Sequence, residues 1–166
     1  MNLQFYLEKL FASEKFESFK KENPEAYFCS GFFVIEENNK KANKIHIDYF
    51  NPETKKIFSF QLEGDCEIVP IEQIPEKNPV KIPDNVEIDF DKVKEMVLKE
   101  MEIKKIKNKI QKILLSLQNK DGKNFLIGTI FISNLGLLKI CVDLEENKII
   151  DFEKKSFFDM LKIMKK

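Results

Sequence analysis

The second half of the chain contains a change of hydrophobic periodicity that one straight helix cannot accommodate. Its first part repeats apolar residues at helical spacing, at Phe90, Val93, Val97 and Met101. The apolar residues that follow, from Ile103 to Ile113, are rotated by roughly 150° around the helix axis, at ~100° per residue. A helix running on to Leu117 would therefore carry apolar faces on nearly opposite sides. The pattern instead predicts a helix over residues 89–108 and a strand over 111–118.

A hairpin signal follows this strand. Asp121-Gly122 lies between two apolar runs, and this dipeptide is typical of a two-residue hairpin turn. Further strands are predicted over 123–133, 136–144 and 148–153, and a short C-terminal helix is predicted to begin after Ser156 as its N-cap.

The first half follows a similar plan. Residues 2–22 predict a helix in two pieces, with Ser13 as the N-cap of the second piece and Asn23-Pro24 as the end. Alternating and apolar runs then predict strands whose ranges are 27–35, 44–50 and 56–62, with a short edge strand over 66–69.

Residues 70–84 contain four prolines, which exclude a helix or a central strand there. We therefore expect an N-terminal helix plus β-meander over 1–69, a Pro-rich linker over 70–88, and a second helix plus meander over 89–166. The fold class is α+β, made of two helix-plus-antiparallel-meander units with a short C-terminal helix.

The two halves also share sequence patterns. Residues 26–33 match 125–131 loosely, and 45–48 match 140–143 more closely. An internal duplication and a chance likeness between short β-rich segments both stay open.

The order of elements over 89–153 resembles that of PepSY-type domains. The residues that carry the resemblance are Ile113–Leu117, Asp121-Gly122, Phe125–Phe131, and Val142-Asp143 with the turn that leads to Ile149-Ile150. The family places Gly where this chain has Asn147, and Asn tolerates the positive φ of such a turn. The resemblance implies a tandem PepSY or cystatin-like fold and a role in protein interaction or inhibition, with no catalytic residues.

The apolar pattern also predicts the hydrophobic core. We expect it to contain Leu7, Leu10, Phe28, Phe32, Val34, Ile45, Ile47, Phe58, Phe60, Val93, Val97, Ile113, Leu115, Phe125, Ile127, Phe131, Ile140, Val142 and Phe152.

Composition narrows the function. All 28 basic residues are lysines, so the chain lacks the planar Arg fork that suits phosphate and guanine recognition. Residues 1–88 hold 11 lysines and 16 acidic residues, whereas 89–166 hold 17 and 12. No apolar stretch approaches the roughly 20 residues of a membrane span, and the N-terminus lacks the basic lead of a signal peptide. These features predict a cytoplasmic protein for which nucleic acid is an unfavoured partner.

Few residues suggest chemistry. His46 and Asp48 lie two apart on a predicted strand and could serve a small hydrolase, with Cys29 or Cys66 as nucleophile. A zinc site would need these two cysteines together with His46 and Cys141. The fold would have to bring the four residues together, which their wide spacing in the sequence disfavours. Asp48 and Asp143 are predicted mainly to accept N–H groups of the turns that follow them.

Two lysine-rich segments suggest other partners. Lys104, Lys105, Lys109 and Lys112 would share a helix face and could bind a polyanion. Residues 157–166 could lie on a membrane surface, although docking on the chain's own sheet is the expected role for so short a helix.

The sequence therefore predicts a non-enzymatic module that binds or inhibits another protein and uses no cofactor and no metal. Polyanion binding through the lysines, and a small hydrolase using His46 and Asp48, are the alternatives.

Overall fold

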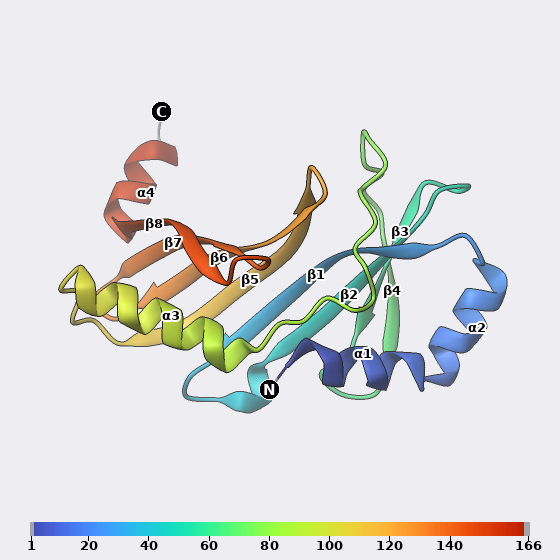
Figure 1. Cartoon of the computed structure of the whole chain (residues 1–166), viewed down its shortest axis with the longest axis horizontal. Helices are drawn as coiled ribbons and strands as arrows, with labels where there is room; N and C mark the ends of the chain where they lie inside the picture. Colours follow the sequence, from blue (N-terminus) through green and yellow to red (C-terminus); the bar gives the residue numbers. More distant parts are fainter. Residues whose placement is uncertain (1, 165–166) are drawn as a thin grey trace.

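A computed structural model describes residues 2–164, and it contains one antiparallel sheet with helices (Figure 1). The elements of the first half are α1 (Leu3–Phe11), α2 (Glu14–Glu22), β1 (Tyr27–Glu36), the 3₁₀ turn η1 (Lys40–Ala42), β2 (Lys44–Asn51), β3 (Lys56–Gln61) and β4 (Glu67–Ile71). Those of the second half are α3 (Phe90–Ile103), β5 (Ile110–Lys120), β6 (Lys123–Ile132), β7 (Gly136–Asp143), β8 (Lys148–Ser156) and α4 (Phe157–Met164).

The two halves share one sheet. Its eight strands lie in the order β4-β3-β2-β1-β5-β6-β7-β8, so the first strands of the two meanders meet at the centre. There β1 and β5 pair antiparallel, from Gly31 opposite Leu117 to Glu36 opposite Lys112. A single cluster of buried apolar residues extends across both halves. The α+β class with an antiparallel sheet is confirmed.

The segment predicted as a linker packs against the sheet. Ile82, Val86 and Ile88 are buried in the common core. The Ile82 N–H donates to the carbonyl of Phe28 at 2.8 Å, and the Leu3 N–H donates to the carbonyl of Ile88 at 2.9 Å. In Figure 1 this part of the chain crosses the sheet between α1 and α3. It therefore connects the two halves and also covers the seam between them.

The helices α1, α2 and α3 lie on the same side of the sheet (Figure 1), which we call the covered face. Their buried residues are Leu3, Leu7, Leu10, Phe16, Phe19, Phe90, Val93, Val97 and Met101. Beneath them lie the fully buried Phe28 and Phe33 of β1, Ile47 of β2 and Leu117 of β5. Most of the predicted core is confirmed. Each of these helices has one apolar stripe, and the clearly alternating strands have one apolar face, so the sequence identifies the residues that point inward.

The prediction fails in β6 and at one position of β1, while Phe58 and Phe152 are partly buried and pack against the core. Phe125, Ile127 and Phe131 are only partly buried, while the neighbouring Leu126, Ile130 and Ile132 are fully covered. Phe32 is also wrong as a core residue, since 37% of its surface is exposed. In these strands both alternating sets are apolar, so alternation alone does not identify the inward side.

The switch from helix to strand after Met101 is confirmed, although the helix is shorter than predicted. α3 begins at the N-cap Asp89 and ends at Ile103, with Lys104 as its C-cap. Lys105 has a φ of 58°, which a helix cannot contain. Lys104, Lys105, Lys109 and Lys112 therefore do not share a helix face. That part of the prediction is wrong.

The capping and turn residues of the sequence correctly predicted the ends of several helices and strands. Ser13 caps α2 by accepting from the Phe16 N–H. Asp121 and Gly122 have φ values of 54° and 84°, as a two-residue hairpin turn requires, and Asn147 has a φ of 52°. The Ser156 hydroxyl accepts from the Asp159 N–H at the start of α4. The side chains of Phe157, Met160 and Met164, on which the docking of this helix was predicted, lie outside the described part.

Candidate functional site: the uncovered face of the sheet

The face of the sheet opposite the helices carries an apolar patch, which we call the open face. Its side chains come from the central strands. Phe32 is exposed, Leu114, Ile127 and Phe131 are partly buried, and Val34 and Leu137 lie on the same side but are buried. Strand register pairs four of them directly, since Val34 is opposite Leu114 and Phe131 is opposite Leu137, whereas Phe32 and Ile127 lie on either side of Ser116. An antiparallel sheet with one free face normally carries polar residues there. This face departs from that rule.

Charged residues surround the patch. Glu36 and Lys112 form an ion pair of 2.8 Å beside Phe131. Lys44 and Lys139 lie on the next row of the same face, opposite Val34 and Thr129. An apolar centre with a charged rim is the usual composition of a protein interface.

A row of polar residues that are buried or partly buried borders the patch on β1, β2 and β3. The Ser30 hydroxyl donates to Oδ2 of Asp48 at 2.8 Å, and Ser59 lies opposite Asp48 on β3. Oδ1 of Asp48 is buried and accepts no hydrogen bond from the described residues. Burial raises the pKa of Asp48, and the hydroxyls of Ser59 and Ser30 offset part of that rise.

The predicted catalytic pair does not form. His46 Nε2 lies 3.2 Å from Oε1 of Glu63, while Asp48 bonds to Ser30. The Cys29 thiol donates to the backbone carbonyl of Asp48 at 3.4 Å, and burial together with the nearby Asp48 carboxylate raises its pKa to about 12. A thiol of that pKa stays protonated near neutral pH and is a poor nucleophile.

The residues considered for zinc stay apart. Cys29 is buried on β1, whereas Cys66 and Cys141 are partly exposed near opposite ends of the strand order. Among residues 2–164, no group of three or more His, Cys, Asp or Glu side chains is arranged to hold a metal ion.

The turn role is confirmed for Asp143 and wrong for Asp48. Oδ1 of Asp143 accepts from the N–H groups of Glu145 and Glu146, at 2.9 and 3.2 Å. Asp48 lies three residues before the end of β2, too early to reach the turn. Asn51 takes that role instead, since its Oδ1 accepts from Glu53 N–H at 2.9 Å.

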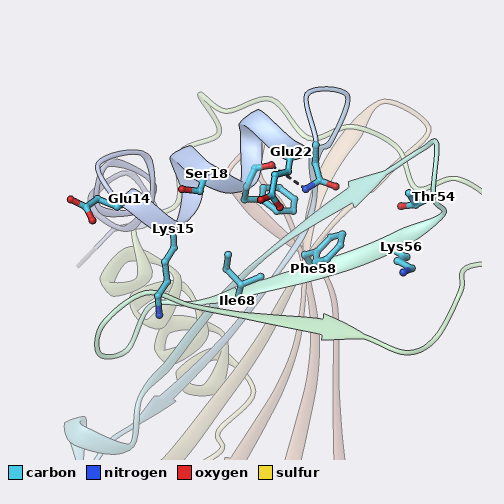
Figure 2. A pocket seen from close by; sticks show the side chains of 10 residues that line it. Glu14, Lys15, Ser18, Glu22, Thr54, Lys56, Phe58 and Ile68 are labelled. Carbon is cyan, nitrogen blue, oxygen red and sulfur yellow. Dashed lines mark hydrogen bonds between the residues drawn. The ribbon is translucent and has the colours of Figure 1, made fainter.

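A groove lies at one edge of the sheet. The groove, of about 660 Å³, runs between α2 and the strands β3 and β4 (Figure 2). Phe19, Phe58 and Ile68 form its apolar part. Glu14, Lys15, Glu22 and Lys56 also line it, so its charges are mixed. The Asn23 side chain, which donates to the Phe19 carbonyl at 3.0 Å and accepts from Asn51 at 2.8 Å, ties the end of α2 to the β2–β3 turn.

Sequence reasoning placed Ile127 and Phe131 in the core and so missed the open face. A usable signal was present. Lys112, Ser116 and Gln118 mark the outer side of β5, and a two-residue hairpin at Asp121-Gly122 fixes the register between β5 and β6. That register puts Leu126 opposite Leu117, which leaves Ile127 on the outer side.

No protein-family model matches the chain, and no curated protein matches it. A solved structure described as a "putative lipoprotein" from Clostridium difficile 630 has a similar fold, with a TM-score of 0.55 and 14% sequence identity. The match covers 86% of this chain and 91% of that one. At this identity the likeness shows the fold alone. None of the described helices combines the length and the apolar composition that a bilayer crossing requires.

Proposed function

We propose that this chain is a non-catalytic module that binds another protein on the open face. The observation that carries the proposal is the apolar patch around Phe32, Ile127 and Phe131, which no helix covers and which charged residues surround. Contiguous exposed apolar surface on a folded domain commonly marks an interaction site. Aromatic side chains at the centre of such a patch are the usual anchors of binding energy.

The likeness to PepSY-type domains supports the same class of function, since that family consists mainly of interaction and inhibitory modules. The order of elements from α3 to β8 agrees with the resemblance, and the positive φ of Asn147 agrees with its place at the family's glycine.

We also propose that the chain contains two helix-plus-meander units joined along β1 and β5. Each half has helix before four antiparallel strands, and the two sets run outward from the seam. The residue matches found in the sequence align β1 with β6 and β2 with β7. The symmetry of the sheet would instead align β1 with β5 and β2 with β6. A duplication therefore rests on the topology more than on those matches.

A capture experiment tests the binding proposal. The tagged protein, incubated with native lysate of cells that encode it, is compared with Phe32→Lys and with Phe5→Lys as a matched control. Phe5 is an exposed phenylalanine of α1, with 61% of its surface accessible, and lies away from the open face. We expect one partner to be retained by the wild type and by Phe5→Lys and lost by Phe32→Lys. Loss in neither variant, or in both, would count against the open face.

The two alternatives have their own tests. A hydrolase using His46 and Asp48 would lose turnover of a reporter ester in His46→Gln, whereas we expect the wild type to show no turnover above buffer. Polyanion binding would appear as association with DNA or RNA at low salt, where the release of counterions favours it most.

A further inference from the structure

Three segments that are distant in sequence meet at one end of the molecule. The Lys109 N–H donates to Oγ of Ser133 at 2.9 Å, and the Ser133 N–H donates to the Lys109 carbonyl at 2.8 Å. These bonds join the connection after α3 to the β6–β7 turn. Gly136, at the start of β7, pairs with Ser156 at the end of β8, which places α4 beside the same turn. Figure 1 shows the end of α3 and α4 on this side of the molecule.

Each of these segments exposes large apolar side chains. Ile103 at the end of α3 is 71% exposed, Leu135 in the turn 60%, and Phe158 on α4 62%. Leu98 and Leu161 add smaller exposed areas at the same end. After α3, a hollow of about 330 Å³ is lined by the apolar Leu98, Met101 and Ile106 and by the polar Glu102, Lys105, Lys107 and Asn108. We call this group the end surface. It adjoins the open face at the β6–β7 turn, beside Phe131 and Leu137, but its exposed apolar side chains belong to other positions.

The end surface is also basic. Lys104, Lys105, Lys107 and Lys109 are all exposed in the connection after α3, where Glu102 is the one acidic residue between positions 102 and 109. Lys154 and Lys162 add exposed ammonium groups from β8 and α4. Of the acidic residues of β8 and α4, Glu153 pairs with Lys155 at 3.7 Å and Asp159 accepts from the Ser156 N–H, while Asp151 is exposed.

The backbone conformation of Leu135 is evidence that the exposed apolar side chains serve a function. It adopts a φ of 56°, next to Asn134 at 61°, in the three-residue loop between the paired Ile132 and Gly136, and a positive φ is a conformation that Gly adopts most easily. A branched side chain pays a steric cost in this conformation. The residue is 60% exposed, so its packing offsets little of that cost.

From this geometry we propose that the end surface binds the surface of an anionic lipid membrane, with Ile103, Leu135 and Phe158 entering the interfacial layer and the lysines contacting lipid phosphates. Apolar side chains mixed with lysines suit a lipid surface, which offers hydrocarbon and negative charge together. A nucleic acid would use the charges and gain little from exposed Ile, Leu and Phe.

Vesicle flotation with the full chain tests the proposal. We expect binding to phosphatidylcholine vesicles that contain phosphatidylglycerol, little binding to pure phosphatidylcholine, and a decrease with salt. Lys105→Glu/Lys107→Glu should weaken binding by at least ~10-fold. The control Lys41→Glu/Lys123→Glu changes the same number of exposed lysines elsewhere and should bind as the wild type does.

The apolar groups are tested separately. Ile103→Gln/Phe158→Gln should lose most binding, and the control Phe5→Gln should not. Leu135→Gly is the sharper test, because it relieves the positive φ and should raise Tm while it weakens vesicle binding. No binding to anionic vesicles at low salt would overturn the proposal. Binding to single-stranded DNA that is as tight, and insensitive to the three apolar changes, would replace it with a polyanion site. These variants leave Phe32 intact, so failure here does not affect the test of the open face.

Discussion

Two neighbouring phenylalanines of β1 show how the two faces of the sheet differ. Phe33 is fully buried and contacts the ring of Phe90 on α3, with 4.9 Å between ring centroids. Phe32 points to the other face, where its ring contact is His46 at 6.1 Å and no helix lies over it. The same residue type thus contributes to the core on one side and stays available to a partner on the other. In this sheet, apolar composition does not by itself identify the core.

The largest expected effect comes from truncating this pair. Phe33→Ala should lower the free energy of unfolding by about 3–5 kcal/mol, because it leaves a cavity under α3. Phe32→Ala should cost less than about 1 kcal/mol, as for a surface position. Urea unfolding of both variants measures the difference. Similar losses in the two variants would contradict the assignment of the faces.

A glycine of the covered face should give the next largest effect. A Cβ added at Gly128 would lie 2.7 Å from Cγ1 of Ile140 and 3.0 Å from Cδ2 of Leu115. We expect Gly128→Ala to destabilise the fold by about 1–3 kcal/mol through overpacking. Gly64→Ala is the control, since nothing lies within 4 Å of its added Cβ. Thermal unfolding of the two variants is the measurement, and an unchanged Tm for Gly128→Ala would show that this face is loosely packed.

The smallest expected effect concerns the buried carboxyl beside the patch. Burial raises the pKa of Asp48 in the folded protein above its unfolded value. Its protonated form is therefore favoured by folding, and that contribution is present at acid pH and lost as the pH rises through the folded pKa. Asp48→Asn should stabilise the protein by about 1 kcal/mol at pH 7, because no buried charge remains. It should also flatten the dependence of stability on pH above the unfolded pKa of the carboxyl. A lower Tm at pH 7 would mean that the Asp48 charge is better solvated than its surroundings indicate.

The parts of the fold that depend on neighbouring residues could be predicted from the sequence. Ser13 and Asp121-Gly122 act through their own backbone and through local hydrogen bonds, so the sequence around them is enough to predict the ends of these elements. The change of periodicity after Met101 belongs to the same class, because it compares two neighbouring stretches of the chain, Phe90–Met101 and Ile103–Ile113.

The parts that depend on distant residues could not be predicted. No local feature of Phe33 or Leu115 requires β1 to pair with β5, so the single sheet stayed hidden behind a proline-rich segment that resembled a linker. The lysines after α3 were assigned to a helix because the end of α3 was placed too late. As a result, the sequence did not predict that these lysines lie at the same end of the molecule as Leu135 and α4.

The candidate site was missed for a related reason. Ile127 and Phe131 satisfy every criterion for core residues except their orientation, which depends on the register of the hairpin that precedes them. An apolar patch on a sheet therefore looks like core when the strand is read alone. The pairing register of the strand, and not the hydrophobicity of its residues, distinguishes core residues from residues of the patch.

Thiol labelling at adjacent positions of one strand tests the central claim most directly. In a background in which the three native cysteines are replaced by serine or alanine, single cysteines are placed at Phe32 and Phe33 and at Ile127 and Leu126. The account predicts that positions 32 and 127 react with an aqueous thiol reagent in the native state, that 33 and 126 react only through unfolding, and that the captured partner protects 32 and 127. Equal rates within each pair, or the reverse order, would contradict an uncovered apolar face.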